Sequence, residues 1–188
     1  FNTYIIVEKG EEMLIIDQHA AHERLNFEAL KKELKESGVT SQMVLMPVEF
    51  AITAAEAETA QENYELLTKM GFEFTIDGVN VSLSAIPSGV GWSDCEDLFL
   101  ELVDEIASNR QEIIDEKKER MLYSISCKAS IKANMHITHT EMKKLVEKVF
   151  ALENINSCPH GRPIVISMSK KEIEKDFKRI VDRKSTRL

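Results

Sequence analysis

Several features that define other protein classes are missing from this sequence. Its 188 residues contain no apolar run near the roughly 20 residues that a membrane-spanning helix needs, and no basic-then-apolar leader. The three cysteines are odd in number and widely spaced, which argues against a disulfide framework. There is also no internal repeat and no low-complexity linker. We therefore expect a globular protein of a reducing, cytoplasmic compartment with no membrane partner.

Charge is distributed unevenly along the chain. The net charge of −8 speaks against a protein that binds nucleic acid. Residues 158–188, however, contain nine Lys or Arg against four Asp or Glu, a net of +5, so the other 157 residues carry −13. A basic segment of this kind is usually a solvated helix face, but it could also meet a phosphate backbone.

Hydrophobic periodicity predicts strands and helices in alternation. Strands at 4–7 and 13–16 form a hairpin around Gly10, and Asp17 stands at the N-cap of a helix at 19–36. The further predicted elements are a strand at 41–53, a helix at 53–71, a hairpin at 72–87, helices at 92–108, 110–131 and 138–152, a strand at 163–168, and a helix at 170–181 capped by Ser169.

These elements predict an α+β fold with an insertion. Residues 1–40 and 118–188 would form a discontinuous two-layer α/β subdomain, and residues 41–117 a smaller inserted α/β subdomain without a polar cluster of catalytic type. The chain starts with Phe1 rather than methionine, so we expect it to lie within a longer protein.

The segment DQHAAHERLNFE gathers metal-ligand side chains at a helix start. His19 and Glu23 are four residues apart and share one helix face, and Asp17 can fold over the same helix start. An imidazole and two carboxylates suit zinc or manganese. Glu28 lies off this face and is expected to be a peripheral ligand or to support one. Alone, the spacing is weak, because such pairs are common on solvated helices.

Two cysteine-containing segments add candidate ligands. In SCPHGRP, Cys158 and His160 flank Pro159 in a loop directly before a strand, and offer one soft and one borderline ligand. Cys127, in SISCKAS, is a third candidate, for which the alternative is a buried small hydrophobic residue.

The remaining histidines and cysteine receive no role in chemistry. His22 points away from the shared face of the helix, and Cys95 has no histidine neighbour, which favours a structural role. His136 and His139 have the spacing of a ligand pair in a strand, but they precede a helix and are expected to be surface histidines.

Taken together, these segments resemble four signatures of the C-terminal domain of the nicking-endonuclease MutL family of DNA mismatch repair. The first motif is Asp-Gln-His-Ala-x-x-Glu-x-x-x-x-Glu, and its fixed positions are all present: Asp17, Gln18, His19, Ala20, Glu23 and Glu28. SCKASI, CPHGRP and FKR resemble the second, third and fourth signatures. They occur in the family's order over residues 17–179, and the chain looks like a domain from a Bacillus-type bacterium.

The resemblance implies a homodimer that nicks one strand of double-stranded DNA with divalent metal, manganese for catalysis and zinc in a regulatory or structural role. The implied catalytic residues are Asp17, His19 and Glu23. The implied metal ligands are Asp17, His19, Glu23, Cys127, Cys158 and His160, with Glu28 peripheral. The implied DNA-positioning residues are Lys128, Arg162, Lys178 and Arg179.

The resemblance also implies partners and a separate role for each subdomain. An N-terminal ATPase domain would precede Phe1, the mismatch-recognition protein MutS would be a partner, and the location would be the bacterial nucleoid. The discontinuous subdomain would carry the site and the dimer interface, to which the strands at 4–7, 13–16 and 163–168 could contribute a shared sheet face. The insertion would be regulatory. Because the domain is acidic and lacks the ATPase, we expect weak nicking by the domain alone.

The segment QMVLMP resembles the Gln-x-x-Leu-x-Pro pattern that docks onto the bacterial sliding clamp. Leu45 and Met46 would enter an apolar pocket while Gln42 bonds at its rim. The implied clamp-binding residues are Gln42, Met43, Val44, Leu45, Met46 and Pro47. The alternative is an ordinary edge strand, which Pro47 also favours.

Two other functions compete with the nuclease. A non-catalytic zinc-binding dimerisation module would use the same Cys and His residues, and the intact first motif is the feature that argues against it. A general zinc hydrolase would need a substrate pocket, and the sequence has no Gly-rich loop or aromatic lining that suggests one.

Overall fold

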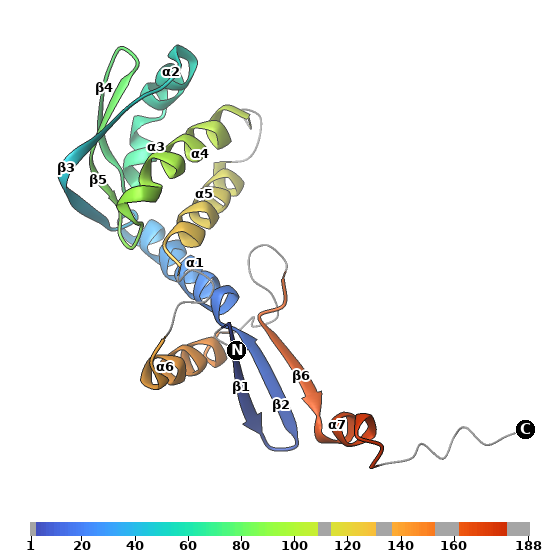
Figure 1. The fold of residues 1–188 in the computed structure, drawn as a ribbon. Helices are drawn as coiled ribbons and strands as arrows, with labels where there is room; N and C mark the ends of the chain where they lie inside the picture. The colour runs from blue at the N-terminus through green and yellow to red at the C-terminus, as the bar shows by residue number, and fades with distance from the viewer. Residues whose placement is uncertain (1–2, 109–113, 131–136, 153–161, 180–188) are drawn as a thin grey trace, which may run out of the picture. The chain divides into compact units, whose positions relative to one another are not determined.

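The computed structural model describes residues 3–108, 114–130, 137–152 and 162–179, which fold as two compact units (Figure 1). Unit 1 comprises Phe1–His22 and Lys132–Leu188, and unit 2 comprises Glu23–Ile131. Each unit has its own small antiparallel sheet with helices, which confirms the α+β fold class. Among the helices that the structure describes, none has the length and apolar character needed to cross a membrane.

Unit 1 is built on a three-stranded sheet. Its strands are β1 (Tyr4–Lys9), β2 (Glu12–Asp17) and β6 (Val165–Ser169), in the order β1-β2-β6. Its helices are the start of α1 (Gln18–Glu36), α6 (His139–Phe150) and α7 (Lys170–Asp176). The predicted hairpin is confirmed, with its turn at Gly10 in the left-handed conformation that favours glycine.

The two faces of this sheet differ in their surroundings. Ile5 and Ile16 are paired across β1 and β2 and are buried on one face. On the other face the register aligns Ile6, Ile15 and Ile166 in one row, and Ile6 and Ile166 are 59% and 50% exposed. An apolar row therefore stands in solvent on the second face of the sheet.

Unit 2 packs four helices and part of α1 against a second sheet. The sheet contains β3 (Ser41–Ala51), β5 (Asn80–Pro87) and β4 (Glu73–Asp77), in the order β3-β5-β4. The helices are α2 (Ala54–Glu62), α3 (Tyr64–Lys69), α4 (Cys95–Ser108), which follows the short turn η1 (Trp92–Asp94), and α5 (Ile114–Lys128). Phe99 on α4 is fully buried, and the rings of Phe50, Phe72 and Phe74 meet it edge-on at 5.1–5.8 Å.

Some predicted helices differ from the observed ones in their extent. The helix predicted at 53–71 is interrupted at Asn63, whose side-chain amide donates to the Thr59 carbonyl at 2.8 Å and competes with the helical backbone. The last helix ends at Asp176 rather than near 181, because Lys178 adopts a left-handed conformation (φ 57°) and the Arg179 amide bonds back to the Glu174 carbonyl at 2.8 Å. The predicted cap Ser169 is confirmed, and of the two threonines at the start of α6, Thr138 rather than Thr140 is the cap.

The compact units divide the chain at other positions than the expected subdomain boundaries of 41 and 117. Most of α1 and the described part of α5 belong to unit 2, because Phe27, Leu30, Met121 and Ile125 lie in its hydrophobic core. The assignment of a dimerising subdomain and a regulatory insertion stays a prediction.

Candidate functional site

Asp17 connects the sheet of unit 1 to the start of α1. Its backbone amide donates to the Ile164 carbonyl at 2.9 Å, which fixes the end of β2 beside the chain that leads into β6. Its Oδ1 accepts a hydrogen bond from the Ala20 amide at 3.0 Å. Asp17 therefore caps α1 as predicted, and a carboxylate with one such bond still has lone pairs for a cation.

The first turns of α1 carry His19, His22 and Glu23. The helix is continuous over these residues, so His19 and Glu23 lie one turn apart as predicted. Glu23 is buried, with 5% of its surface exposed. Burial lowers the pKa of half-buried His22, and the charges of Lys148 on α6 and of His19 add to the effect. Lys148 thus lies close to this helix start, which no pattern in the sequence indicated.

Within unit 2, α1 and α5 run antiparallel, with side-chain pairs at four-residue spacing. These pairs are Lys31–Glu119, Phe27–Tyr123 and Glu23–Cys127. The first is an ion pair, and the second is a stack with ring centroids 4.3 Å apart. The third joins two of the segments that the sequence singled out, although 104 positions separate them.

The Cys127 thiol donates a hydrogen bond to the Glu23 carboxylate. Desolvation raises the pKa of this thiol to about 11, and the hydrogen bond and the negative charges of Glu23 and Glu101 act in the same direction. The residue as a whole is exposed, so it is not the buried hydrophobic residue of the alternative interpretation. The contact thus brings together a sulfur and a carboxylate, two side-chain types that ligate metal ions once the thiol loses its proton.

Hydrogen bonds also tie α1 to the residues around Cys127. The Asn26 side-chain amide donates to the Ala129 carbonyl at 3.3 Å and to Ser130 Oγ at 3.1 Å. Ser130 Oγ in turn donates to the Ser126 carbonyl at 2.6 Å. The end of α5 is thereby fastened to α1 just beyond Cys127, and Ser130 links this point back to Ser126 on the other side of the cysteine.

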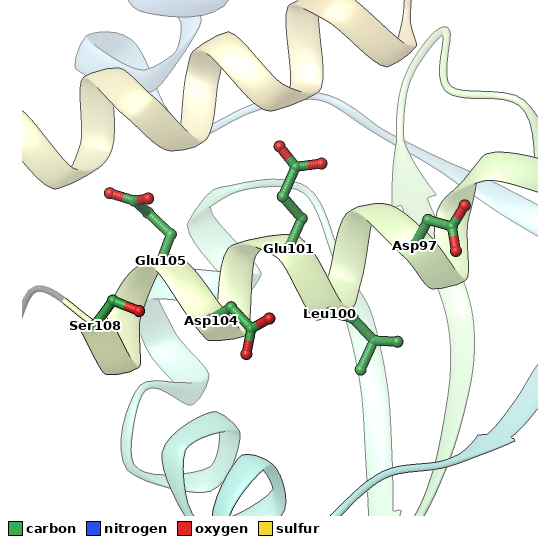
Figure 2. A pocket seen from close by; sticks show the side chains of 6 residues that line it. All are labelled: Asp97, Leu100, Glu101, Asp104, Glu105 and Ser108. Carbon is green, nitrogen blue, oxygen red and sulfur yellow. The ribbon is translucent and has the colours of Figure 1, made fainter.

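α5 also contacts α4, through acidic side chains of α4 (Figure 2). The side chains of Glu101 and Glu105 point toward α5, where Glu101 accepts from Ser124 Oγ at 2.6 Å and Glu105 pairs with Arg120. These carboxylates are engaged in helix packing, so we assign them a structural role.

The remaining predicted site residues fall into three groups. Cys158 and His160 lie outside the described residues, as does His136, for which no role in the site was predicted. Glu28 pairs with Arg24 at 2.7 Å, and its peripheral role at the site stays a prediction. Lys128 is half-buried, and the side chains of Arg162, Lys178 and Arg179 are exposed. In the described ranges, no group of three or more His, Cys, Asp or Glu is arranged to hold a metal ion.

The segment with the clamp-binding pattern bulges from an edge strand. Met43 pairs with Ala85 and Val48 with Leu83, so residues 44–47 stand opposite Ser84 alone. Leu45 is fully exposed. Gln42, expected at the rim of a partner's pocket, instead donates to the Val90 carbonyl at 2.8 Å and accepts from the Gly89 amide at 3.3 Å.

Comparison with known proteins gives a consistent match. Residues 1–137 match the family described as the MutL C-terminal dimerisation domain. The chain is 40% identical over 186 residues to the DNA mismatch repair protein MutL of Agathobacter rectalis, and 36% and 37% identical over 180 residues to the MutL proteins of Clostridium botulinum and Clostridium acetobutylicum.

These alignments cover 95–96% of this chain but only 27–29% of the relatives' length, so the chain corresponds to one part of a longer protein in those bacteria. The match of a dimerisation domain supports homodimer formation. On the family match and these identities, the chain belongs to the MutL C-terminal dimerisation domain family of DNA mismatch repair proteins.

Proposed function

We propose that this chain is the metal-dependent endonuclease domain of a MutL-type mismatch repair protein and nicks one strand of duplex DNA. The observation that carries the proposal is the contact between Glu23 and Cys127. It joins the DQHA helix to the second signature, and both supply ligand atoms that suit zinc or manganese. A dimerisation module without catalysis would not need the complete first motif.

The ligand set would combine residues from three segments of the chain. Asp17, His19, Glu23 and Cys127 would hold divalent metal together with Cys158 and His160 of the third signature. The bound metal would supply an activated water and would offset charge on the phosphate. The cations Lys128, Arg162, Lys178 and Arg179 would position the DNA backbone. Thiolates favour zinc, so we assign zinc a regulatory or structural role and manganese the catalytic one.

A nicking assay on supercoiled plasmid tests this function. We expect slow relaxation of the plasmid with Mn²⁺, complete inhibition by EDTA, and faster nicking when an N-terminal ATPase domain and a sliding clamp are supplied. Tight zinc binding without nicking under all these conditions would favour the second candidate, a zinc-binding dimerisation module. The nuclease proposal includes MutS as a partner and a cytoplasmic, nucleoid-associated location.

The proposed homodimer interface is the exposed face of the unit 1 sheet. Its central row is Ile6, Ile15 and Ile166, and Ile173 of α7 meets one end of this face. Beside this row, Ile6, Met13 and Ile173 line a groove of about 460 Å³ together with charged side chains that include Glu8, Lys170 and Arg179. An exposed apolar row beside charges of both signs suits a two-fold axis, about which each copy would cover the other's row.

Clamp docking through residues 42–47 predicts different effects for neighbouring side chains. Replacing Leu45 and Met46 together with alanine should abolish clamp binding and leave the melting temperature unchanged, because both side chains are exposed. Gln42→Ala should instead lower the unfolding free energy by about 1–2 kcal/mol, because it removes two internal hydrogen bonds. Surface plasmon resonance against the clamp and thermal melts check both. Unchanged clamp affinity in the double variant would reject the docking site.

A further inference from the structure

Asn26 lies in the first signature but at none of its fixed positions. It is three residues after Glu23, so the two side chains leave α1 on neighbouring sides. Glu23 meets the Cys127 thiol, and Asn26 reaches the residues just beyond it, Ala129 and Ser130. One helix turn of α1 therefore contacts Cys127 directly and holds the chain that follows it.

Side-chain hydrogen bonds to backbone carbonyls stabilise a helix most at its C-terminal end. α5 ends at Lys128, one residue after Cys127. The last carbonyls of a helix lack partners within the helix, and the last turn frays easily. Asn26 supplies a donor to the Ala129 carbonyl, and Ser130 returns a bond to the Ser126 carbonyl. Ser126 and Ser130 are buried, so water does not readily replace these bonds.

We infer that Asn26 is a positioning residue, which holds Cys127 against Glu23 through Ala129 and Ser130. An effect of Asn26 on metal affinity rests on the proposed function, in which Glu23 and Cys127 are ligands. The positioning of Cys127 does not rest on it, because it is a property of the metal-free chain. In metal sites, groups that do not bind the metal often orient its ligands through hydrogen bonds. Asn26 would orient Cys127 in the same way.

Asn26→Asp is the sharpest variant. Aspartate has the same size as asparagine, but its carboxylate cannot donate and would face the Ala129 carbonyl and Ser130 Oγ. Asn63→Asp is the matched control, because the Asn63 amide also donates to a backbone carbonyl in unit 2, that of Thr59. Ser130→Ala is a milder second variant, because it removes the two bonds of Ser130 Oγ but keeps the bond from Asn26 to the Ala129 carbonyl.

The first measurement uses the metal-free chain. Iodoacetamide labelling followed by peptide mass spectrometry gives the alkylation rate of Cys127 separately from those of Cys95 and Cys158. We expect Asn26→Asp to raise this rate at least about threefold, because the thiol leaves the Glu23 carboxylate, and Asn63→Asp to leave it unchanged. Ser130→Ala should show a smaller increase, and it decides the question if circular dichroism shows that Asn26→Asp does not fold.

The second measurement is a Co²⁺ titration followed by the thiolate-to-cobalt absorption band. We expect Asn26→Asp to weaken cobalt affinity at least about tenfold, with Asn63→Asp as wild type. If the wild type shows no thiolate band, the metal part of the proposed function fails, while the alkylation rates still decide the role of Asn26. Wild-type alkylation rates of Cys127 in both Asn26→Asp and Ser130→Ala would overturn the inference.

Discussion

Replacing Asp17 with asparagine is expected to leave the fold intact and to reduce nicking by at least about a hundredfold, since loss of a group that only supports a ligand already costs 10–100-fold. The substitution separates two roles of one side chain. As a cap, Asp17 accepts from the Ala20 amide at 3.0 Å, and asparagine caps helices as well as aspartate. As a proposed metal ligand, it needs the negative charge that asparagine lacks.

Two further variants complete this test in the plasmid assay with Mn²⁺. Asp17→Ala should lose nicking and also about 1 kcal/mol of stability, because it removes the cap as well as the charge. Asp115→Asn applies the same change to an exposed carboxylate that pairs with Lys118 on the surface of α5, and should nick as the wild type does. Near-normal nicking by Asp17→Asn would remove Asp17 from the site and weaken the nuclease assignment as a whole.

Local patterns in the sequence predicted most of the fold. The turn at Gly10 and the caps at Asp17 and Ser169 depend on residues close to each other in the sequence. The helix at 53–71 was predicted without a break, because the bond from Asn63 to Thr59 is only one of several that an asparagine can make. Short-range sequence patterns thus predicted where the helices and strands lie better than where they end.

The candidate site could be predicted only in part, because its contacts join distant segments. The approach of Glu23 and Cys127 depends on how α1 packs on α5, so the resemblance, rather than any spacing, named them together. Nothing in the sequence marked Asn26, whose partners lie 103 and 104 positions away. Gln42 matched a docking pattern, but its partners Gly89 and Val90 belong to its own unit.

Ile6→Glu is expected to convert the proposed homodimer into a monomer. Ile6 is 59% exposed in the single chain and stands in the apolar row with Ile15 and Ile166. A two-fold interface would bury the substituted residue of both copies, and each unpaired carboxylate is costly to desolvate. We expect the dimer dissociation constant to rise by at least about a hundredfold, equivalent to roughly 2.7 kcal/mol. Because the side chain is exposed in the single chain, the monomer should remain folded.

Sedimentation velocity over a range of concentrations measures this change directly. Ile166→Glu, on the other edge strand of the same row, should have a similar effect. Val79→Glu makes a matched change at an exposed apolar residue in the hairpin turn of unit 2 and should leave the dimer intact. If Ile6→Glu and Ile166→Glu both dimerise as the wild type does, the interface must lie outside this face, and the exposed row would then need another partner to cover it.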